Sequence, residues 1–180
     1  MQVERTPLEG LLVVVPQRFG DARGFFSESW SRRAMEAAGL EIDFVQDNHS
    51  LSRAKGTVRG LHYQAPPVAQ AKLVRCGRGR LLDVAVDARR ASPTYGRWHA
   101  EELSFENGRQ LLVPAGFLHG FATLEPDTEV VYKCSASYSR AHDGAVRWDS
   151  AGVDWGVRDP VLSDKDAAAP AFSEWESPFD

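Results

Sequence analysis

Two short stretches of this sequence contain the residue types needed to hold a phosphorylated substrate and to move a proton on it. Thr57–Lys72 has the length of a strand, a loop and a second strand, and Gly108–His119 follows the spacing G-x5-P-x-G-x2-H. Arginine pairs bidentately with phosphate oxygens, histidine exchanges protons near neutral pH, and lysine stabilises negative charge. We therefore predict that the two stretches form the halves of one site. The candidates are Arg59, His62, Gln64, Lys72 and His119.

Each of these candidates also has a purely structural interpretation. A single histidine in a strand is more often a hydrogen-bonded core residue than a catalyst, so His62 and His119 carry weight mainly as a pair. Lys72 shares an expected strand face with Val74 and Cys76, and lysine is seldom buried without a partner. The alternative for Lys72 is a lysine on an edge strand whose ammonium group reaches solvent.

The segments that position these residues are predicted to be β-strands. Between residues 40 and 148, short apolar runs are separated by turn signals at Gly77–Gly79, Ser92–Gly96 and Asn107–Gly108, and the last is a typical hairpin dipeptide. Many short antiparallel strands in one chain predict a sandwich, a jelly roll or a barrel.

Alternation along two of these strands predicts which side chains point inward. In Leu81–Asp87, three aliphatic residues alternate with Asp83, Ala85 and Asp87, which predicts one buried and one wetter face. In Thr128–Cys134, Tyr132 shares a face with two residues that suit a core.

Strict alternation would place Arg59 and His62 on opposite faces of their strand. Both can serve one pocket only if the strand bulges or bends between them, and Gly60 is the residue that permits this. We therefore predict an irregularity at Gly60.

The flanking regions show weaker patterns. Leu11–Pro16 is β-branched and apolar and predicts a strand, whereas Ser31–Ala38, with Ser31 as a cap and Gly39 after it, predicts the one clear helix. Asp21–Glu28 turns at a glycine, and its composition favours two phenylalanines in the core over a binding loop on the surface. The tail after residue 154 is predicted to be loop-like.

Composition excludes several classes of protein. The chain has 180 residues, 43% hydrophobic and 26% charged, and a net charge of −4, which predicts one globular domain with no preference for nucleic acid or anionic membranes. The N-terminus does not resemble a signal peptide, and no apolar run is long enough to span a membrane, so we expect a soluble cytoplasmic protein. Cys76 and Cys134 are expected to be reduced, packed thiols.

The motifs themselves resemble a known family. The G-x5-P-x-G-x2-H spacing is similar to the second motif of the cupin jelly rolls, whereas the first cupin motif, which supplies a His-x-His pair and a glutamate to a metal, is broken because position 64 is glutamine. The chain as a whole resembles the dTDP-4-dehydrorhamnose 3,5-epimerase family. The blocks that carry this resemblance are DARGFFSE (Asp21–Glu28), QDNHS (Gln46–Ser50), RGLHYQ (Arg59–Gln64), Gln70–Val74, VPAGFLHGF (Val113–Phe121), VVYKCSASY (Val130–Tyr138) and LSDKD (Leu162–Asp166).

The resemblance implies an all-β fold, a cupin-type jelly roll or double-stranded β-helix with one or few short helices. A single domain would span residues 1–180, with N-terminal strands, a jelly-roll core over about residues 40–150 and a loop-rich C-terminal tail. It also implies a homodimer with exchanged N-terminal strands, a dTDP-sugar as substrate, and no metal or redox cofactor.

The resemblance also assigns roles to residues. His62 matches the general base and Asp166 its paired carboxylate, Tyr132 matches the general acid on the opposite side of the sugar, and Lys72 matches the cation near the C4 oxygen. Asp143 stands where the family usually has glutamate, and its side chain is shorter by one methylene. The residues that would bind the nucleotide, the pyrophosphate or the sugar are Arg23, Phe26, Glu28, Gln46, Asp47, Asn48, His49, Arg59, His119, Tyr138, Asp143 and Lys165.

The implied reaction is epimerisation at C3 and C5 of dTDP-4-dehydro-6-deoxy-D-glucose to dTDP-4-dehydro-L-rhamnose, through enolates, in dTDP-L-rhamnose biosynthesis. A base and a cation suit this chemistry, because the C4 carbonyl acidifies both positions and its oxygen collects the enolate charge. Three alternatives stay open: an epimerase that acts at C3 only or C5 only, a metal-dependent cupin with His62 and His119 as ligands, and a non-catalytic protein that binds nucleotide sugars.

Overall fold

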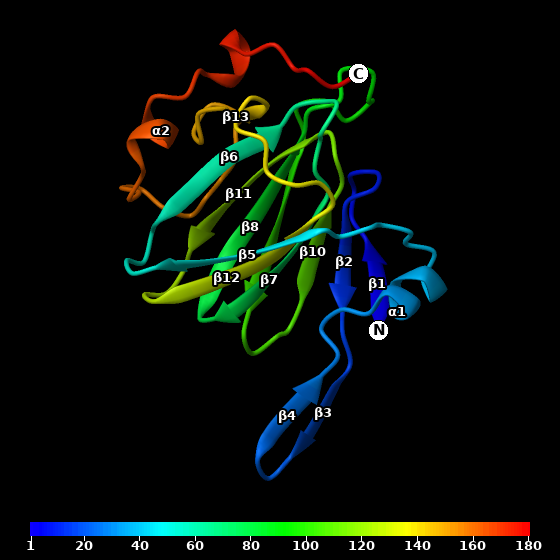
Figure 1. The fold of residues 1–180 in the computed structure, drawn as a ribbon. Coiled ribbons are helices and arrows are strands. Elements are labelled where there is room, and N and C mark those ends of the chain that lie inside the picture. The colour runs from blue at the N-terminus through cyan, green and yellow to red at the C-terminus, as the bar shows by residue number, and fades with distance from the viewer.

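The computed structural model describes residues 1–180 and consists mainly of two antiparallel sheets packed face to face (Figure 1). One sheet has six strands in the order β1 (Gln2–Arg5), β2 (Leu12–Val15), β10 (Gln110–Val113), β7 (Lys72–Arg78), β12 (Thr128–Cys134) and β5 (Gln46–Ser52). The other has five, in the order β13 (Asp143–Ala145), β6 (Val58–Gln64), β11 (Phe117–Thr123), β8 (Arg80–Asp87) and β9 (Trp98–Ser104). The predicted all-β fold is confirmed.

The main core lies between the two sheets. Every second side chain of a strand points to the same face, so Val74 and Leu111 of the six-stranded sheet meet Leu81 and Phe121 of the five-stranded sheet in one buried cluster. The strand predicted at Leu11–Pro16 is β2, which pairs with β1 and β10. Cys76 and Cys134 are buried free thiols, as predicted, and burial raises the pKa of Cys76 to about 11.

The prediction that one face of β8 (Arg80–Asp87) is exposed to water is wrong. Asp83 and Asp87 are 0% exposed, because their face of the strand points into the sandwich. The opposite face is buried too, since Val84 packs beneath Trp155 and Phe179 of the C-terminal segment. The alternation of polar and apolar residues suggests one exposed face. It is misleading for a strand that is buried on both faces and whose inward polar side chains have buried partners.

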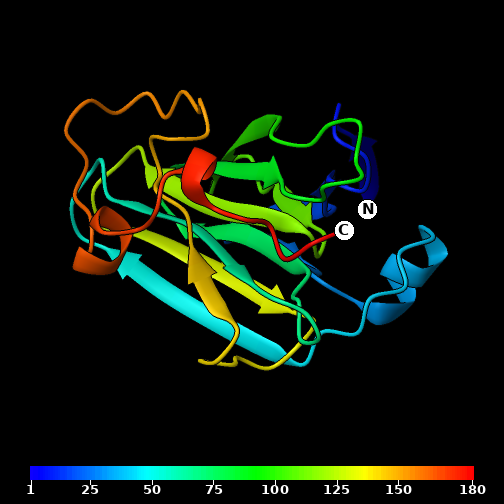
Figure 2. The same ribbon diagram turned by 90° about the horizontal axis from the view of Figure 1, so that it is seen from above.

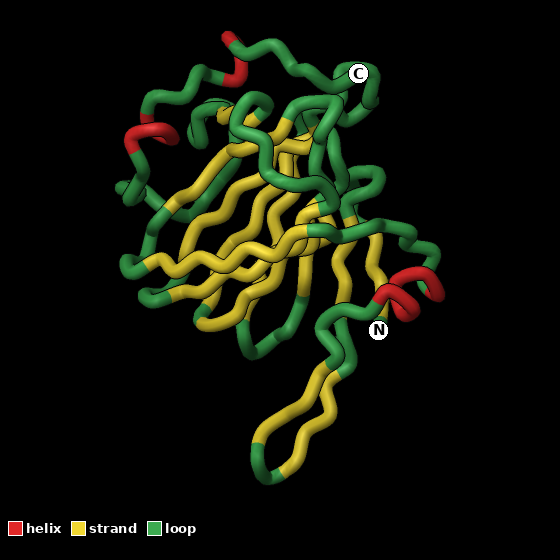
Figure 3. Tube along the Cα trace, viewed as in Figure 1, coloured by secondary structure: helices red, strands yellow, loops and turns green.

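The C-terminal segment is not simply a loop. It contains α2 (Asp164–Ala167) and a 3-10 turn at Phe172–Glu174, and it runs along the outside of the five-stranded sheet (Figures 2 and 3). The predicted first helix is α1 (Arg32–Ala37), which ends before Gly39 in the left-handed conformation at φ +78°. Ser31 stands at the N-cap but makes no side-chain capping bond. None of the helices has the length and apolar character required to cross a bilayer.

The β3 (Arg18–Asp21) and β4 (Gly24–Ser27) strands form a hairpin that extends away from the body of the molecule (Figure 1). The prediction that its phenylalanines fill the core is wrong, because Phe25 is 44% exposed and Phe26 is 71% exposed. The Arg18 guanidinium lies 4.1 Å from the Phe25 ring centroid and covers part of that ring.

The prediction that Asn107–Gly108 closes a hairpin is wrong. This turn joins β9 to β10, which belong to opposite sheets, so the turn carries the chain across the sandwich. Asn107 donates to the carbonyl of Glu102 and accepts from the amides of Ser104 and Arg109, which fixes the turn. A dipeptide with the right turn conformation therefore does not reveal whether its flanking strands pair.

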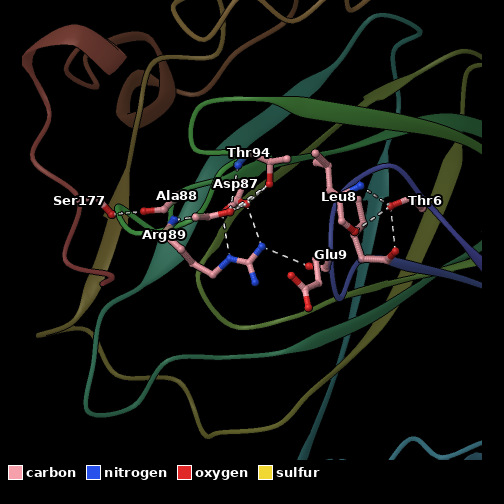
Figure 4. Close-up of polar contacts among 10 residues, drawn as sticks. Thr6, Leu8, Glu9, Asp87, Ala88, Arg89, Thr94 and Ser177 are labelled. Atoms are coloured by element: carbon pink, nitrogen blue, oxygen red, sulfur yellow. Dashed lines mark hydrogen bonds and ion pairs between the residues drawn. The ribbon is translucent and has the colours of Figure 1, made fainter.

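A cluster around Asp87 ties distant parts of the chain together (Figure 4). Asp87 accepts hydrogen bonds from Arg89, Ser92 and Thr94, and Arg89 also donates to the carbonyl of Glu9 at 3.1 Å. Burial raises the pKa of Asp87, but the hydrogen bonds from Arg89, Ser92 and Thr94 outweigh it and lower the pKa to about 2. Asp87 is therefore an ionised carboxylate that fixes Arg89, and Arg89 in turn joins the β8–β9 connection to the N-terminal loop.

We expect Asp87→Asn to lower the free energy of unfolding at pH 7 by about 2–4 kcal/mol, because Arg89 loses its buried counter-ion. The folded pKa lies below the ordinary value of about 3.9, so the stabilisation from Asp87 is complete above that value and is lost as the pH falls towards 2. Urea denaturation from pH 7 to pH 2 measures both effects. Parallel stability curves for parent and variant across the acid range would contradict this role.

Candidate active site

A pocket of about 160 Å3 opens where strands of both sheets come together. It is lined by Ser50 of β5, Arg59 and His62 of β6, Lys72 of β7, His119 and Phe121 of β11, and Tyr132 of β12. The two stretches that the sequence singled out therefore lie side by side, as predicted. The pairing of β6 with β11 explains this, because His62 and His119 are register partners.

The irregularity predicted at Gly60 is present. His119 pairs with His62 and Phe121 pairs with Arg59, so one residue more lies between the pairs on β6 than on β11. A Cβ atom on Gly60 would lie 2.6 Å from the Gly120 Cα, so only glycine allows the strands to approach this closely. As a result, Arg59 and His62 line the same pocket.

The imidazole of His62 is held by a carboxylate from the C-terminal segment. His62 Nε2 lies 2.5 Å from Asp166 Oδ1, and Asp166 is 3% exposed whereas the His62 side chain is 32% exposed. Burial raises the pKa of Asp166, but the hydrogen bond and charge of His62 outweigh it and lower the pKa below its usual range. Asp166 therefore fixes the ring of His62 and can stabilise its protonated form.

Asp166 owes its position to α2. The Ser163 hydroxyl accepts a hydrogen bond from the Asp166 amide at 3.2 Å and so caps the N-terminus of this helix. The LSDKD block thus forms the capped start of α2, a single helical turn from which the Asp166 carboxylate reaches His62 on β6.

Lys72 and Tyr132 lie on adjacent inner strands, and the Lys72 ammonium is 6.0 Å from the Tyr132 ring centroid. β7 lies between β10 and β12, so the edge-strand interpretation of Lys72 is wrong. Burial lowers the pKa of Lys72 and raises the pKa of Tyr132, so the phenol holds its proton at neutral pH. The predicted inward face of β12 is confirmed.

His119 is bound more deeply than His62. Its Nε2 lies 2.8 Å from Asp83 Oδ1, and both residues are buried, while Asp83 Oδ2 has no hydrogen-bond partner. Each pocket histidine is therefore paired with a carboxylate of its own. No group of three or more His, Cys, Asp or Glu side chains converges in a way that could hold a metal ion.

A second group of predicted contacts lies beside α2. Asp143 of β13 accepts from the Lys165 ammonium at 2.5 Å and from the Tyr138 hydroxyl at 3.4 Å. Gln46 accepts from the Tyr138 amide at 2.8 Å and donates to Asn48 at 3.0 Å. The Asp143 carboxylate, which is one methylene shorter than that of glutamate, thus forms an ion pair with Lys165 of the same chain.

Two other predicted residues face away from the pocket. Alternation along β5 directs Asp47 and His49 to the outer face of the six-stranded sheet. There Asp47 accepts from Lys133 at 2.7 Å, and His49 Nε2 lies 3.1 Å from a Glu129 carboxylate oxygen.

The β3–β4 hairpin and the segment after it carry three further predicted contacts, Arg23, Phe26 and Glu28, none of which lines the pocket. Arg23 is 90% exposed and pairs with Asp21 in the hairpin turn. All three residues are exposed. Within a single chain the structure therefore does not bring them to His62.

Two residues that line the pocket, Ser50 and Phe121, are not among the site residues predicted from the sequence. The Ser50 hydroxyl is buried and has no hydrogen-bond partner. Alternation along β5 could have found it, because Gln46, Asn48 and Ser50 share a face of that strand.

Comparison with known proteins agrees with this geometry. The family model described as dTDP-4-dehydrorhamnose 3,5-epimerase matches residues 5–174. A dTDP-4-dehydrorhamnose 3,5-epimerase of Sinorhizobium fredii is 52% identical over 165 residues, which cover 90% of this chain and 85% of the relative.

Solved structures give the same result. The crystal structure of dTDP-4-dehydrorhamnose 3,5-epimerase from Bacillus anthracis, with TDP and PPi bound, has a TM-score of 0.93 and 46% identity over 95% of this chain and 99% of that one. A dTDP-6-deoxy-D-glucose-3,5-epimerase from Legionella pneumophila, in complex with dTDP-4-keto-L-rhamnose, has a TM-score of 0.90 and 41% identity over 96% and 93% of the two chains. The fold is accordingly a cupin-like jelly roll, and this chain belongs to the dTDP-4-dehydrorhamnose 3,5-epimerase family.

Proposed function

We propose that this chain catalyses epimerisation at C3 and C5 of dTDP-4-dehydro-6-deoxy-D-glucose, giving dTDP-4-dehydro-L-rhamnose for dTDP-L-rhamnose biosynthesis. The observation that carries the proposal is the His62–Asp166 pair, which opens onto one pocket together with Lys72 and Tyr132. These groups supply a base, a cation and a proton donor. A protein that only binds nucleotide sugars would have no need of the set.

The first half of each inversion is removal of a proton. His62 takes the proton from C5 or C3, and the electrons of the broken C–H bond move into an enolate whose charge collects on the C4 oxygen. Asp166, an anion in the folded protein, stabilises the imidazolium that forms. Lys72, which lines the same pocket, stabilises the enolate oxygen as an oxyanion-hole group does.

The second half returns a proton to the opposite face of the same carbon. Tyr132 is the donor, since burial raises its pKa and keeps its hydroxyl protonated. The phenol proton forms the new C–H bond and the enolate electrons return to carbon. Before the second inversion, the phenolate recovers a proton from solvent and the His62 imidazolium releases its proton to solvent.

The reaction is tested by supplying the substrate in deuterated water and locating the label in the product. Label at both C3 and C5 in an L-configured sugar supports the proposal. Label and inversion at only one carbon would identify the single-site epimerase that the sequence left open. Absence of exchange at either carbon, in protein that binds dTDP, would overturn the assignment as an enzyme of this reaction.

We further propose that the active protein is a homodimer with exchanged N-terminal segments, in which the β3–β4 hairpin and the segment after it serve the pocket of the partner subunit. Arg23, Phe26 and Glu28 are exposed in the isolated chain and distant from its own pocket. A pyrophosphate needs cations and a flat ring can stack on a base, so the hairpin offers an additional cation and an additional exposed ring for the nucleotide part of the substrate.

This arrangement predicts that two inactive variants rescue one another. Arg23→Ala/Phe26→Ala keeps an intact pocket and His62→Ala keeps an intact hairpin, so a mixed dimer would contain one complete site. After unfolding and refolding together, about one site in four should be active, because half of the dimers are mixed. Activity measured before and after co-refolding checks this, with each variant refolded alone as the control. No recovery in verified mixed dimers would place the hairpin outside the site.

A further inference from the structure

The loop that follows β12 is held by three glutamine side chains. Gln64 donates to the Ser137 carbonyl at 3.1 Å and accepts from the Ser139 amide at 2.7 Å. Gln70 donates to the Ala136 carbonyl at 2.7 Å, and Gln46 accepts from the Tyr138 amide at 2.8 Å. Four consecutive residues, 136–139, therefore each bind a glutamine amide through their backbone. We call Gln46, Gln64 and Gln70 the glutamine clamp.

Gln64 is the central member of the clamp. It is 5% exposed, and besides its two bonds to the loop it donates to the Val68 carbonyl at 2.5 Å. A glutamine amide has two donor hydrogens and a carbonyl acceptor, and all of these groups are used here. Gln64 stands where the first cupin motif has its second histidine, and it lies opposite Asp143 in the register of β6 and β13.

Apart from the clamp, the loop is restrained at its two ends, at Ser135 and at Ser139, whose carbonyl and hydroxyl groups both bond to His142. It carries no regular secondary structure, and its first residue is anchored by the pair of bonds between Ser135 and Ala71. Tyr138 is 59% exposed, and its hydroxyl approaches Asp143 at 3.4 Å, which in turn binds Lys165. The glutamines therefore determine where this exposed ring stands relative to the side of the site formed by β13 and α2.

We propose that Gln64 and Gln70 are positioning residues for nucleotide binding, acting through the loop that presents Tyr138. This inference rests on the proposed function, because it takes the dTDP part of the substrate as the group that Tyr138 contacts. Gln46 is held at both ends of its amide by the protein itself, so it belongs to the same clamp, although the resemblance places it among the substrate contacts.

A role in positioning differs from a role in folding alone. If the clamp only stabilised the fold, its loss would lower the melting temperature and leave the affinity of the folded protein for dTDP unchanged. If the clamp orders the Tyr138 loop before binding, its loss must weaken dTDP binding, because the ligand then has to order the loop itself. The His62–Asp166 pair does not touch the loop, so kcat should change less than KM.

The experiment compares Gln64→Met with the parent and with Tyr138→Ala and the double variant. Methionine has the length of glutamine and removes all three bonds. Calorimetry with dTDP should show a Kd about tenfold higher for Gln64→Met. A tenfold change in Kd corresponds to the free energy of one to two hydrogen bonds, which here would have to be supplied to order the loop on binding. In the Tyr138→Ala background the same change should have little further effect, since the two residues act as one unit.

Two further variants keep the test decisive. Thr128→Val is the matched control, because this buried threonine also donates to backbone carbonyls, those of Arg80 and Glu125, but at the other end of β12. It should bind dTDP as the parent does. If Gln64→Met does not fold, Gln70→Met removes a single bond from the half-buried edge of the clamp and should raise the Kd by about threefold.

The outcomes distinguish a failure of the glutamine clamp from a failure of the proposed function. A parent that does not bind dTDP would refute the proposed function itself. A parent that binds dTDP, with glutamine variants of equal affinity, would refute the clamp as a positioning device and leave the proposed function standing. If Gln64→Met lowered the affinity for dTDP equally in the parent and in the Tyr138→Ala background, Gln64 would affect binding independently of Tyr138, which would contradict the proposal.

Discussion

Replacing His62 by alanine is expected to abolish hydrogen exchange at both C3 and C5 of the substrate. His62 is the pocket histidine that is partly exposed to solvent, whereas His119 is buried, and the carboxylate partner of His62 lies in the capped helix α2 outside the sandwich. A single base must therefore serve the two carbons in turn. Loss of a general base lowers a rate by roughly 10²–10⁴-fold, and here that loss applies to both inversions. Proton NMR of the substrate in deuterated water measures the two exchange rates separately.

His99→Ala is a suitable control for this experiment. His99 is half-buried beside Glu101 and does not line the pocket, so its loss should leave both exchange rates near those of the parent. Exchange that survives at one carbon in His62→Ala would demonstrate a second base. His119 would then be the first residue to examine, since it is the other histidine in the pocket.

Tyr132→Phe is expected to separate proton removal from inversion. Phenylalanine keeps the ring and leaves the His62–Asp166 pair untouched, so the enolate still forms and His62 returns a solvent-derived proton to the face from which it was taken. Deuterium should therefore enter C5 with retained configuration, while inversion at C5 falls by roughly 10²–10⁴-fold. Mass spectrometry follows the label, and NMR of the sugar follows the configuration.

Tyr63→Phe provides the matched control. Tyr63 neighbours His62 on β6, but its ring lies in the outer cluster and its hydroxyl accepts a hydrogen bond from the Trp175 indole at 3.0 Å. This variant should lose a little stability and keep its rate of inversion. A Tyr132→Phe variant that inverts C5 as fast as the parent would make Tyr132 a structural residue and require another donor.

Much of the site could be predicted because it depends on local rules. Alternation on β12 fixed the direction of Tyr132, and the need to direct two polar residues to one side identified Gly60 as the irregular position. These rules use only the strand period and the steric freedom of glycine. They hold wherever the strand assignment is right.

The errors arise where the environment of a segment depends on distant chain. β8 appeared half-exposed because nothing local reveals that the C-terminal segment covers its outer face, or that Asp83 has a histidine partner on β11. The phenylalanines of the β3–β4 hairpin illustrate the opposite error, since apolar composition cannot distinguish residues of a buried core from residues of an exposed apolar surface.

The C-terminal segment has a consequence for how activity and stability are linked. It supplies Asp166 to His62, and it is attached to the outside of the five-stranded sheet by an apolar cluster that includes Trp155 and Phe179 and by an isolated bridge between Thr57 and Val161. Detachment of this segment would thus be a local unfolding event, because the core between the two sheets contains no residue of the segment. Molecules in that partly open state would retain most of their β-structure and have an unsupported base, so catalytic competence would disappear before cooperative denaturation.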